Sequence, residues 1–96
     1  MRYFTEKRRK KLDEQISIYS CLKKMNDAVV IQMSPDLFSE LISYNNAYTI
    51  YSRDGMHPHK YKGCDLILAS GESFLSIAYV DTRTGMITKQ REIKED

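Results

Sequence analysis

The chain has 96 residues, of which 42% are hydrophobic and 29% charged, and its formal net charge at pH 7 is +2. This length supports one modest hydrophobic core, so we expect a single domain over residues 1–96. The composition is ordinary for a soluble globular protein and excludes wholesale disorder. No apolar run approaches the roughly 18 residues that a membrane-spanning helix needs, so no membrane association is expected.

Basic residues are concentrated at the N-terminal end. Residues 1–24 contain eight basic and three acidic residues, whereas residues 25–96 contain seven basic and ten acidic ones. Such an asymmetric charge distribution can bind an acidic partner, a nucleic acid or another copy of the same chain. No apolar stretch closely follows the basic start, so we expect no secretory signal. With only two cysteines, Cys21 and Cys64, we expect reduced thiols and a cytoplasmic location.

Residues 5–26 are predicted to form a long helix with Thr5 as its N-cap. Placing residues at 100° steps predicts one buried stripe, which consists of Leu12, Ile16, Ile18, Tyr19, Leu22 and Met25. This stripe is wider than the seam of a coiled coil, and a small domain is not expected to cover all of it. We therefore also predict a homodimer formed through this helix.

Five consecutive cations lie near the start of this helix: Lys7, Arg8, Arg9, Lys10 and Lys11. Consecutive residues on a helix point in all directions around its axis, so burial of this turn would bury a charged group at a large free-energy cost. We therefore expect segment 1–26 to project partly from the domain at its N-terminal end. The five cations are candidate partner-binding residues, and the alternative is that the run is only solvated or pairs with acidic groups of the protein itself.

A strand and a second helix are predicted next. Residues 28–33 are rich in β-branched side chains and are expected to form a strand buried on both faces. Ser34 is a suitable N-cap, Pro35 fits the first helical position, and Asp36 interacts favourably with the helix dipole. The helix at 34–44 is expected to pack on one face of the sheet.

Four further strands are predicted at 48–51, 64–69, 73–80 and 86–93. Residues 56–63 are expected to form a loop, and Gly85 to take the left-handed position of a hairpin turn. The last three strands are expected to form a meander whose polar final strand lies at an edge. The expected fold class is α+β, with a long N-terminal helix, a second short helix and a small, mostly antiparallel sheet of about five strands (α-β-α-β-β-β-β).

Four tyrosines in the middle of the chain are further candidate partner-binding residues: Tyr44, Tyr48, Tyr51 and Tyr61. Tyrosine is favoured at protein interfaces because it combines a large rigid ring with a polar tip. The alternative is that these side chains are half-buried packing residues.

The histidines and cysteines do not predict a metal centre or a catalytic site. His57 and His59 form one pair near Cys64, whereas zinc sites usually show two spaced pairs of ligands. The common catalytic motifs are missing, and Cys64 begins an apolar strand, where a buried thiol is inert. We therefore expect no metal, no cofactor and no enzymatic activity.

The stretch from Val29 to Ser70 contains a strand, then MSPDLFSEL, then RDG and then YKGCDLILAS. It resembles a pattern seen in phage-encoded proteins, including capsid-like modules, in which an "MSP" helix precedes a glycine-led apolar strand. The resemblance implies a phage or mobile-element origin, with the host cytoplasm as its location. Small proteins of that origin often act by docking on larger ones.

The leading hypothesis is a non-enzymatic binding protein that acts by protein–protein contact, such as a phage-type accessory or inhibitor protein. The basic run would steer the partner, and the region Tyr44–Tyr61 would anchor it. One alternative is a nucleic-acid-binding accessory protein that uses Lys7–Lys11. Another is a minor structural or assembly component.

Overall fold

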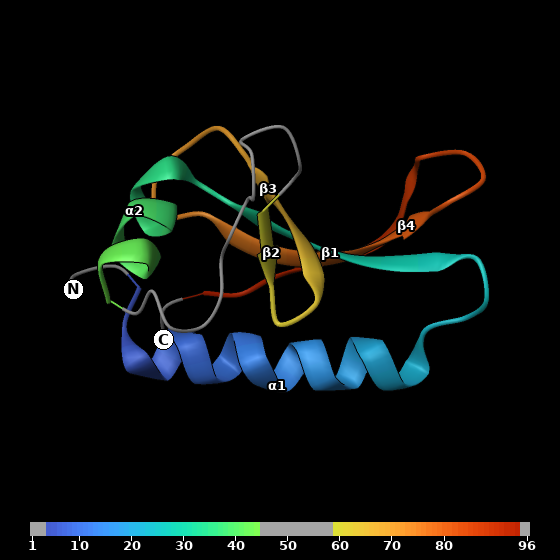
Figure 1. Cartoon of the computed structure of the whole chain (residues 1–96), viewed down its shortest axis with the longest axis horizontal. Helices are drawn as coiled ribbons and strands as arrows, with labels where there is room; N and C mark the ends of the chain where they lie inside the picture. Colours follow the sequence, from blue (N-terminus) through green and yellow to red (C-terminus); the bar gives the residue numbers. More distant parts are fainter. Residues whose placement is uncertain (1–3, 45–58, 95–96) are drawn as a thin grey trace.

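The computed structural model describes residues 4–44 and 59–94. Its elements, in chain order, are α1 (Glu6–Leu22), β1 (Asp27–Met33), α2 (Pro35–Tyr44), β2 (His59–Tyr61), β3 (Cys64–Leu68), β4 (Leu75–Asp81) and β5 (Ile87–Glu92). The predicted α+β class and the mostly antiparallel five-stranded sheet are confirmed (Figure 1). The strand predicted at 48–51 lies outside the described residues, and part of the predicted loop at 56–63 forms β2 instead.

The five strands lie in the order β2-β3-β1-β4-β5. The predicted meander of the last three strands is therefore wrong, because β1 lies between β3 and β4. Val30 of β1 has Asp65 of the parallel strand β3 on one side and Ala78 of the antiparallel strand β4 on the other. Parallel neighbours need a crossover connection, and α2 belongs to the crossover here. The prediction that the last strand is an edge is confirmed.

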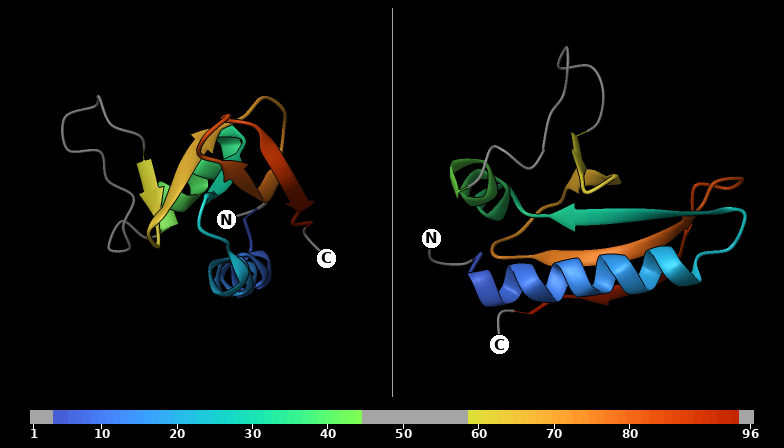
Figure 2. Two further views of the ribbon diagram at one scale, coloured as in Figure 1. Left: turned by 90° about the vertical axis from the view of Figure 1, so that its right-hand side faces the viewer. Right: turned by 60° about the horizontal axis from the view of Figure 1, so that its bottom comes forward.

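Helix α1 lies beneath the sheet, which arches over it, and runs alongside β1 and β4 (Figure 2). Leu12, Ile16 and Tyr19 are buried, and their spacing of four and three residues places them on one face of the helix. Burial of each such side chain stabilises the fold by roughly 1.5–3 kcal/mol. The Tyr19 and Tyr79 rings also pack with centroids 4.6 Å apart, and the Tyr79 hydroxyl donates to the Tyr19 carbonyl.

The predicted buried stripe of α1 is only half correct. Ile18, Leu22 and Met25 are 42%, 65% and 93% exposed. At 100° per residue, Ile18 and Leu22 lie roughly 120° and 80° from the centre of the buried face, so they fall on its flank. Met25 follows the end of the helix.

The basic end of α1 does not project as expected, because Arg8 is buried, with only 2% of its surface exposed. Its guanidinium Nε donates to the Ile93 carbonyl at 3.0 Å, and its two terminal nitrogens donate to the Ser73 hydroxyl at 2.8 Å and the Ser73 carbonyl at 2.6 Å. These acceptors replace water around the charge, which is the condition under which a buried cation is tolerated. Arg8 therefore attaches the start of α1 to Ser73, which precedes the β4–β5 hairpin, and to Ile93, which follows it.

The start of α2 is fastened to the turn between β3 and β4. The Ser34 hydroxyl donates to the Asp36 carboxylate and accepts a hydrogen bond from the Phe74 N–H at 2.9 Å. The other Asp36 oxygen accepts a hydrogen bond from the Ser73 N–H at 2.8 Å. The hydrogen bond from Ser34, aided by that from Ser73, holds the pKa of Asp36 below its ordinary value of 3.8.

Asp36→Asn is expected to lower the free energy of unfolding by about 1 kcal/mol at pH 7, the usual net value of an intramolecular hydrogen bond. A carboxylate whose pKa is lower in the folded state stabilises the fold above its unfolded pKa, and this stabilisation is lost as the pH falls through its folded pKa. The stability difference between wild type and Asp36→Asn should therefore narrow below about pH 4. Urea unfolding between pH 2.5 and 7 measures this stability difference, and Glu72→Gln, a change at an exposed residue, is the control. A difference that stays constant over this range would contradict the role given to the carboxylate.

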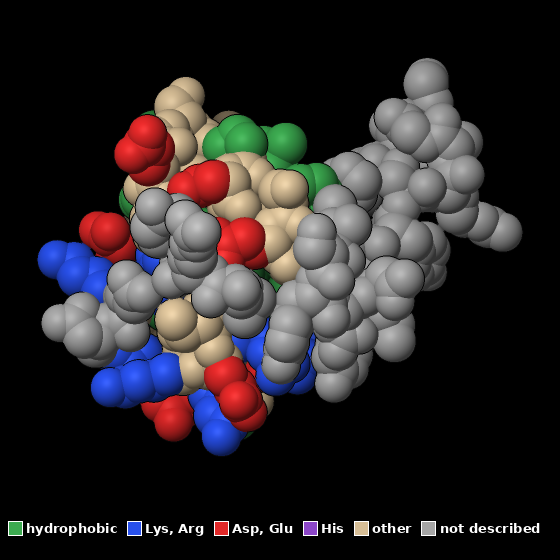
Figure 3. Space-filling model, turned by 90° about the vertical axis from the view of Figure 1, so that its left-hand side faces the viewer, with side chains coloured by type: hydrophobic (Ala, Val, Ile, Leu, Met, Phe, Trp, Pro, Cys, Tyr) green, Lys and Arg blue, Asp and Glu red, His purple; other side chains and the backbone are tan. Residues whose placement is uncertain are grey.

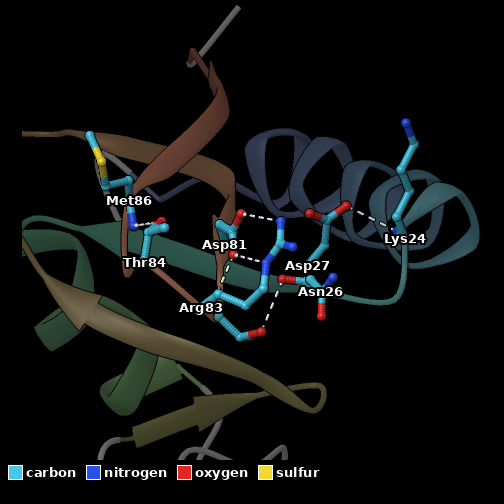
Figure 4. Close-up of polar contacts among 8 residues, drawn as sticks. Lys24, Asn26, Asp27, Asp81, Arg83, Thr84 and Met86 are labelled. Carbon is cyan, nitrogen blue, oxygen red and sulfur yellow. Dashed lines mark hydrogen bonds and ion pairs between the residues drawn. The ribbon is translucent and has the colours of Figure 1, made fainter.

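At the opposite end of the molecule, the turn between α1 and β1 meets the turn between β4 and β5 (Figure 4). The Thr82 N–H donates to the Asn26 carbonyl at 2.9 Å and joins the two turns. Arg83 forms an ion pair with Asp81 at 3.1 Å, and its hydrogen bonds hold the pKa of Asp81 below the ordinary value. Gly85 has φ +74°, so the left-handed position predicted for it is confirmed.

Candidate binding groove between α1 and β5

A groove separates the flank of α1 from the edge strand β5. It consists of two hollows of about 310 and 320 Å³ that share Gln15 and Arg91 in their linings. One hollow lies between Lys11–Gln15 and residues 91–94, and the other lies between Gln15–Tyr19 and residues 89–91. The groove therefore follows the last strand of the sheet for most of its length.

The cations of β5 point to the groove because of the register of the sheet. Lys89 lies opposite Tyr79, and Arg91 lies opposite Ile77. Directly opposite residues of antiparallel strands share a face of the sheet, and Tyr79 and Ile77 belong to the core that α1 covers. Lys89 and Arg91 therefore lie on the helix-facing side of β5. The Lys89 ammonium lies 5.5 Å from the centroid of the Tyr19 ring, within the range of a cation–π interaction.

Positive charge exceeds negative charge around the groove. Its lining includes the four cations Lys11, Lys89, Arg91 and Lys94 and the two acids Glu14 and Glu92. The four ion pairs found within residues 4–44 and 59–94 involve other cations, namely Lys10, Lys60, Lys62 and Arg83. The cations of the groove take part in none of these ion pairs, so the groove can attract an anionic group. Lys and Arg side chains also lie along the end of the molecule at which α1 begins, with Asp and Glu side chains between them (Figure 3).

The edge of β5 also presents backbone groups that are unpaired within the described sheet and directed away from β4. The Ile93 N–H donates to the Leu75 carbonyl at 2.8 Å, so residues 93 and 75 form a hydrogen-bonded pair. Such pairs alternate along an antiparallel ladder, so Arg91 also directs its backbone groups toward β4. The N–H and C=O groups of Gln90 and Glu92 then point away from the sheet. A further strand could pair with them.

The five cations of the basic run have different environments. Arg8 is buried, although a surface position was expected, so its guanidinium is not exposed to a partner. Lys7 and Lys10 are exposed, and Lys10 forms a 3.8 Å ion pair with Glu6. Arg9 and Lys11 are half-buried, and Lys11 lines the groove. Of the run, Lys11 is the member that shares a site with the cations of β5.

Tyr61 is fully buried in the core, so its ring is not exposed for the predicted anchoring contact. Its hydroxyl donates to Asp13 of α1 at 2.9 Å, and the neighbouring Lys62 forms a 3.1 Å ion pair with the same carboxylate. This environment arises because β2 extends the sheet over α1, where a loop was expected. Tyr48 and Tyr51 lie outside the described residues, as does the side chain of Tyr44 at the end of α2.

The two thiols have different environments, and the metal-binding residue types do not cluster in the part of the chain described. Cys64 is buried, as predicted, and its burial raises the pKa of its thiol, so the neutral form is favoured. Cys21 is exposed on α1, and neither cysteine is in a disulfide. No three His, Cys, Asp or Glu side chains gather to hold a metal ion within 4–44 and 59–94. His57 and the His59 side chain lie outside the described residues.

The cations of β5 were missed as site residues in the sequence. The alternation of Lys89 and Arg91 around Gln90 was a usable signal, because residues two apart on a strand share a face. The sequence alone did not show that this face of β5 lies beside Lys11 of α1.

Comparison of the chain with protein-family models, with curated proteins and with solved structures gave no match. Neither helix of the described chain combines the length and the apolar character that a bilayer crossing requires.

Proposed function

We propose that this protein is a non-enzymatic binding protein that holds an acidic segment of another protein in the groove between α1 and β5. The observation that carries the proposal is the set of four cations around the groove, Lys11, Lys89, Arg91 and Lys94, none of which pairs with a carboxylate of the described chain. An acidic ligand would gain favourable charge contacts and faster association from this arrangement.

Two further features favour a polypeptide ligand. Ile18, which is 42% exposed, contributes apolar surface to the wall of the groove. The free edge of β5 offers backbone donors and acceptors, which extended peptides commonly use when they bind beside a strand. Neither feature would help to bind a phosphate backbone, whose recognition depends mainly on Lys and Arg.

The test compares three fluorescein-labelled octapeptides, ETETETET, KTKTKTKT and TSTSTSTS, by fluorescence anisotropy. Only the acidic peptide is expected to bind, with an affinity that falls as the salt concentration rises. Reversing two charges with Lys89→Glu and Arg91→Glu replaces attraction by repulsion and should weaken binding at least about tenfold.

The matched control is the double variant Lys24→Glu and Lys60→Glu, which changes the net charge equally but alters residues outside the groove. This control should keep most of the affinity. Equal losses in the two double variants would mean that net charge, and not the groove, attracts the peptide. Failure of ETETETET to bind at low salt would refute the proposed function.

Nucleic-acid binding is the second candidate. Lys7 is exposed and lies one helical turn before Lys11, so the two extend the positive charge of the groove along α1. A complex with about five phosphate contacts would show a log–log slope of about −4 to −5 for affinity against salt concentration. Binding of labelled duplex DNA at two salt concentrations measures this slope, and no binding at low salt would reject this candidate.

The homodimer and assembly roles stay predictions. Ile18, Leu22 and Met25 provide exposed apolar surface at one end of α1. Concentration-dependent light scattering would detect association through this surface, and Leu22→Ser would be expected to weaken it.

A further inference from the structure

We propose that the bound segment forms an additional antiparallel strand along the free edge of β5, with acidic residues in its first half and apolar residues in its second. This inference rests on the proposed function and adds the binding mode, the direction and the side-chain pattern of the ligand. It follows from the orientation of the backbone of β5 and from the different character of the two ends of the groove.

The first argument concerns the backbone. Gln90 and Glu92 direct their N–H and C=O groups away from β4, as derived from the Ile93–Leu75 hydrogen bond. All six residues of β5 are exposed, so no described element covers this edge. Pairing with an extended segment would satisfy both residues at once and would continue the β2-β3-β1-β4-β5 sheet by one strand.

The second argument concerns the polarity of the groove. Helix α1 and strand β5 run in opposite directions, so the start of α1 lies beside the end of β5 (Figure 1). Lys11, Arg91 and Lys94 line that end. The other end is lined by Ile18 and Tyr19, together with Lys89. The groove is therefore strongly basic at one end and partly apolar at the other.

Leu22 continues the apolar end of the groove. Residues 11, 15, 18 and 22 are spaced by four, three and four along α1, so they lie on one flank of the helix. Because Lys11, Gln15 and Ile18 all line the groove, this flank is the one that faces β5. Leu22, which is 65% exposed, extends the same flank toward the end of the helix.

These arguments determine the ligand pattern. Antiparallel pairing is slightly more stable per residue than parallel pairing, so the first half of the segment would lie beside residues 91–94 and the second half beside residues 87–89. Every second residue of the segment would share the face of Lys89 and Arg91. The expected ligand thus alternates, with groove-facing carboxylates first and groove-facing aliphatic side chains afterwards.

The experiment uses the full chain labelled with ¹⁵N and two octapeptides of equal composition, ETETLTLT and LTLTETET. Amide hydrogen exchange of the free protein is expected to be at least about tenfold faster at Gln90 and Glu92 than at Arg91. Saturation with ETETLTLT should slow exchange at Gln90 and Glu92 at least about tenfold and leave Arg91 unchanged. The dissociation constant of LTLTETET should be at least about fivefold higher than that of ETETLTLT.

The outcomes distinguish failure of the proposed function from failure of the added-strand proposal. If neither octapeptide nor ETETETET binds, the proposed function fails. If both octapeptides bind equally and exchange at Gln90 and Glu92 stays fast, the segment is held by its charges alone and the added strand is refuted. If exchange at these two residues slows with protein concentration and without peptide, the edge pairs with a second copy, which also refutes the inference.

Discussion

Replacement of Arg8 by Met is expected to lower the free energy of unfolding by about 2–4 kcal/mol. Methionine fills much of the space of the arginine stem but donates no hydrogen bonds. The Ile93 carbonyl and the Ser73 carbonyl and hydroxyl would then lose the donors that now lie 3.0, 2.6 and 2.8 Å away. A buried acceptor without a donor destabilises the folded state by its full desolvation penalty.

Urea denaturation followed by circular dichroism measures this loss. Lys7→Met changes the neighbouring, exposed cation and should shift the free energy of unfolding by no more than about 0.5 kcal/mol. Arg8→Lys keeps the charge but not the planar fork, so it should recover less than half of the stability. If Arg8→Met unfolds at the same urea concentration as Lys7→Met, the buried guanidinium network does not stabilise the fold.

Ile77→Ala is expected to lower the free energy of unfolding by about 3–4 kcal/mol. Ile77 is fully buried in β4, and its neighbours across the strands are Ile31 of β1 and Arg91 of β5. Truncation removes apolar contact and leaves a cavity that the packed strands can fill only partly. Because Ile77 lies opposite Arg91, its truncation would also remove packing contacts that support β5.

Ile87→Ala is the matched control, since Ile87 is 46% exposed on the adjacent strand. It should lower the free energy of unfolding by less than about 1 kcal/mol. Thermal unfolding of both variants provides a second measurement. Equal losses in the two variants would mean that Ile77 does not belong to a close-packed core.

Local signals predicted the elements and the fold class well. The Ser34–Asp36 cap predicted the start of α2, and Gly85 predicted the last hairpin turn. The polar character of residues 86–93 correctly indicated an edge strand. These features depend on neighbouring residues and on the period of the hydrophobic pattern, which a single sequence contains.

Pairing between distant segments could not be predicted in the same way. Strands β3 and β4 follow each other in the chain, yet β1 lies between them, with its residues Val30 and Ile31 buried on opposite faces. The periodicity of each strand is compatible with several neighbours. Sequence patterns alone therefore do not choose between the meander and the observed order.

The candidate site required the same kind of distant information. Arg8 was expected at the surface because burial of an unpaired charge is costly. The acceptors that make its burial possible, at residues 73 and 93, are 65 and 85 positions away along the chain. The groove likewise combines Lys11 with Lys89 and Arg91. Charge counting identified the basic segment, but tertiary structure decided which of its cations stays available to a ligand.

The hydrogen bond from Arg8 to the Ile93 carbonyl has a consequence for biosynthesis. When the ribosome has made only the first half of the chain, the arginine has neither this acceptor nor Ser73. Helix α1 can form at that stage, but its charged side chain must stay hydrated until the last strand emerges. Folding of this unit is therefore expected to complete only after translation has passed residue 93, with α1 docking as a late event.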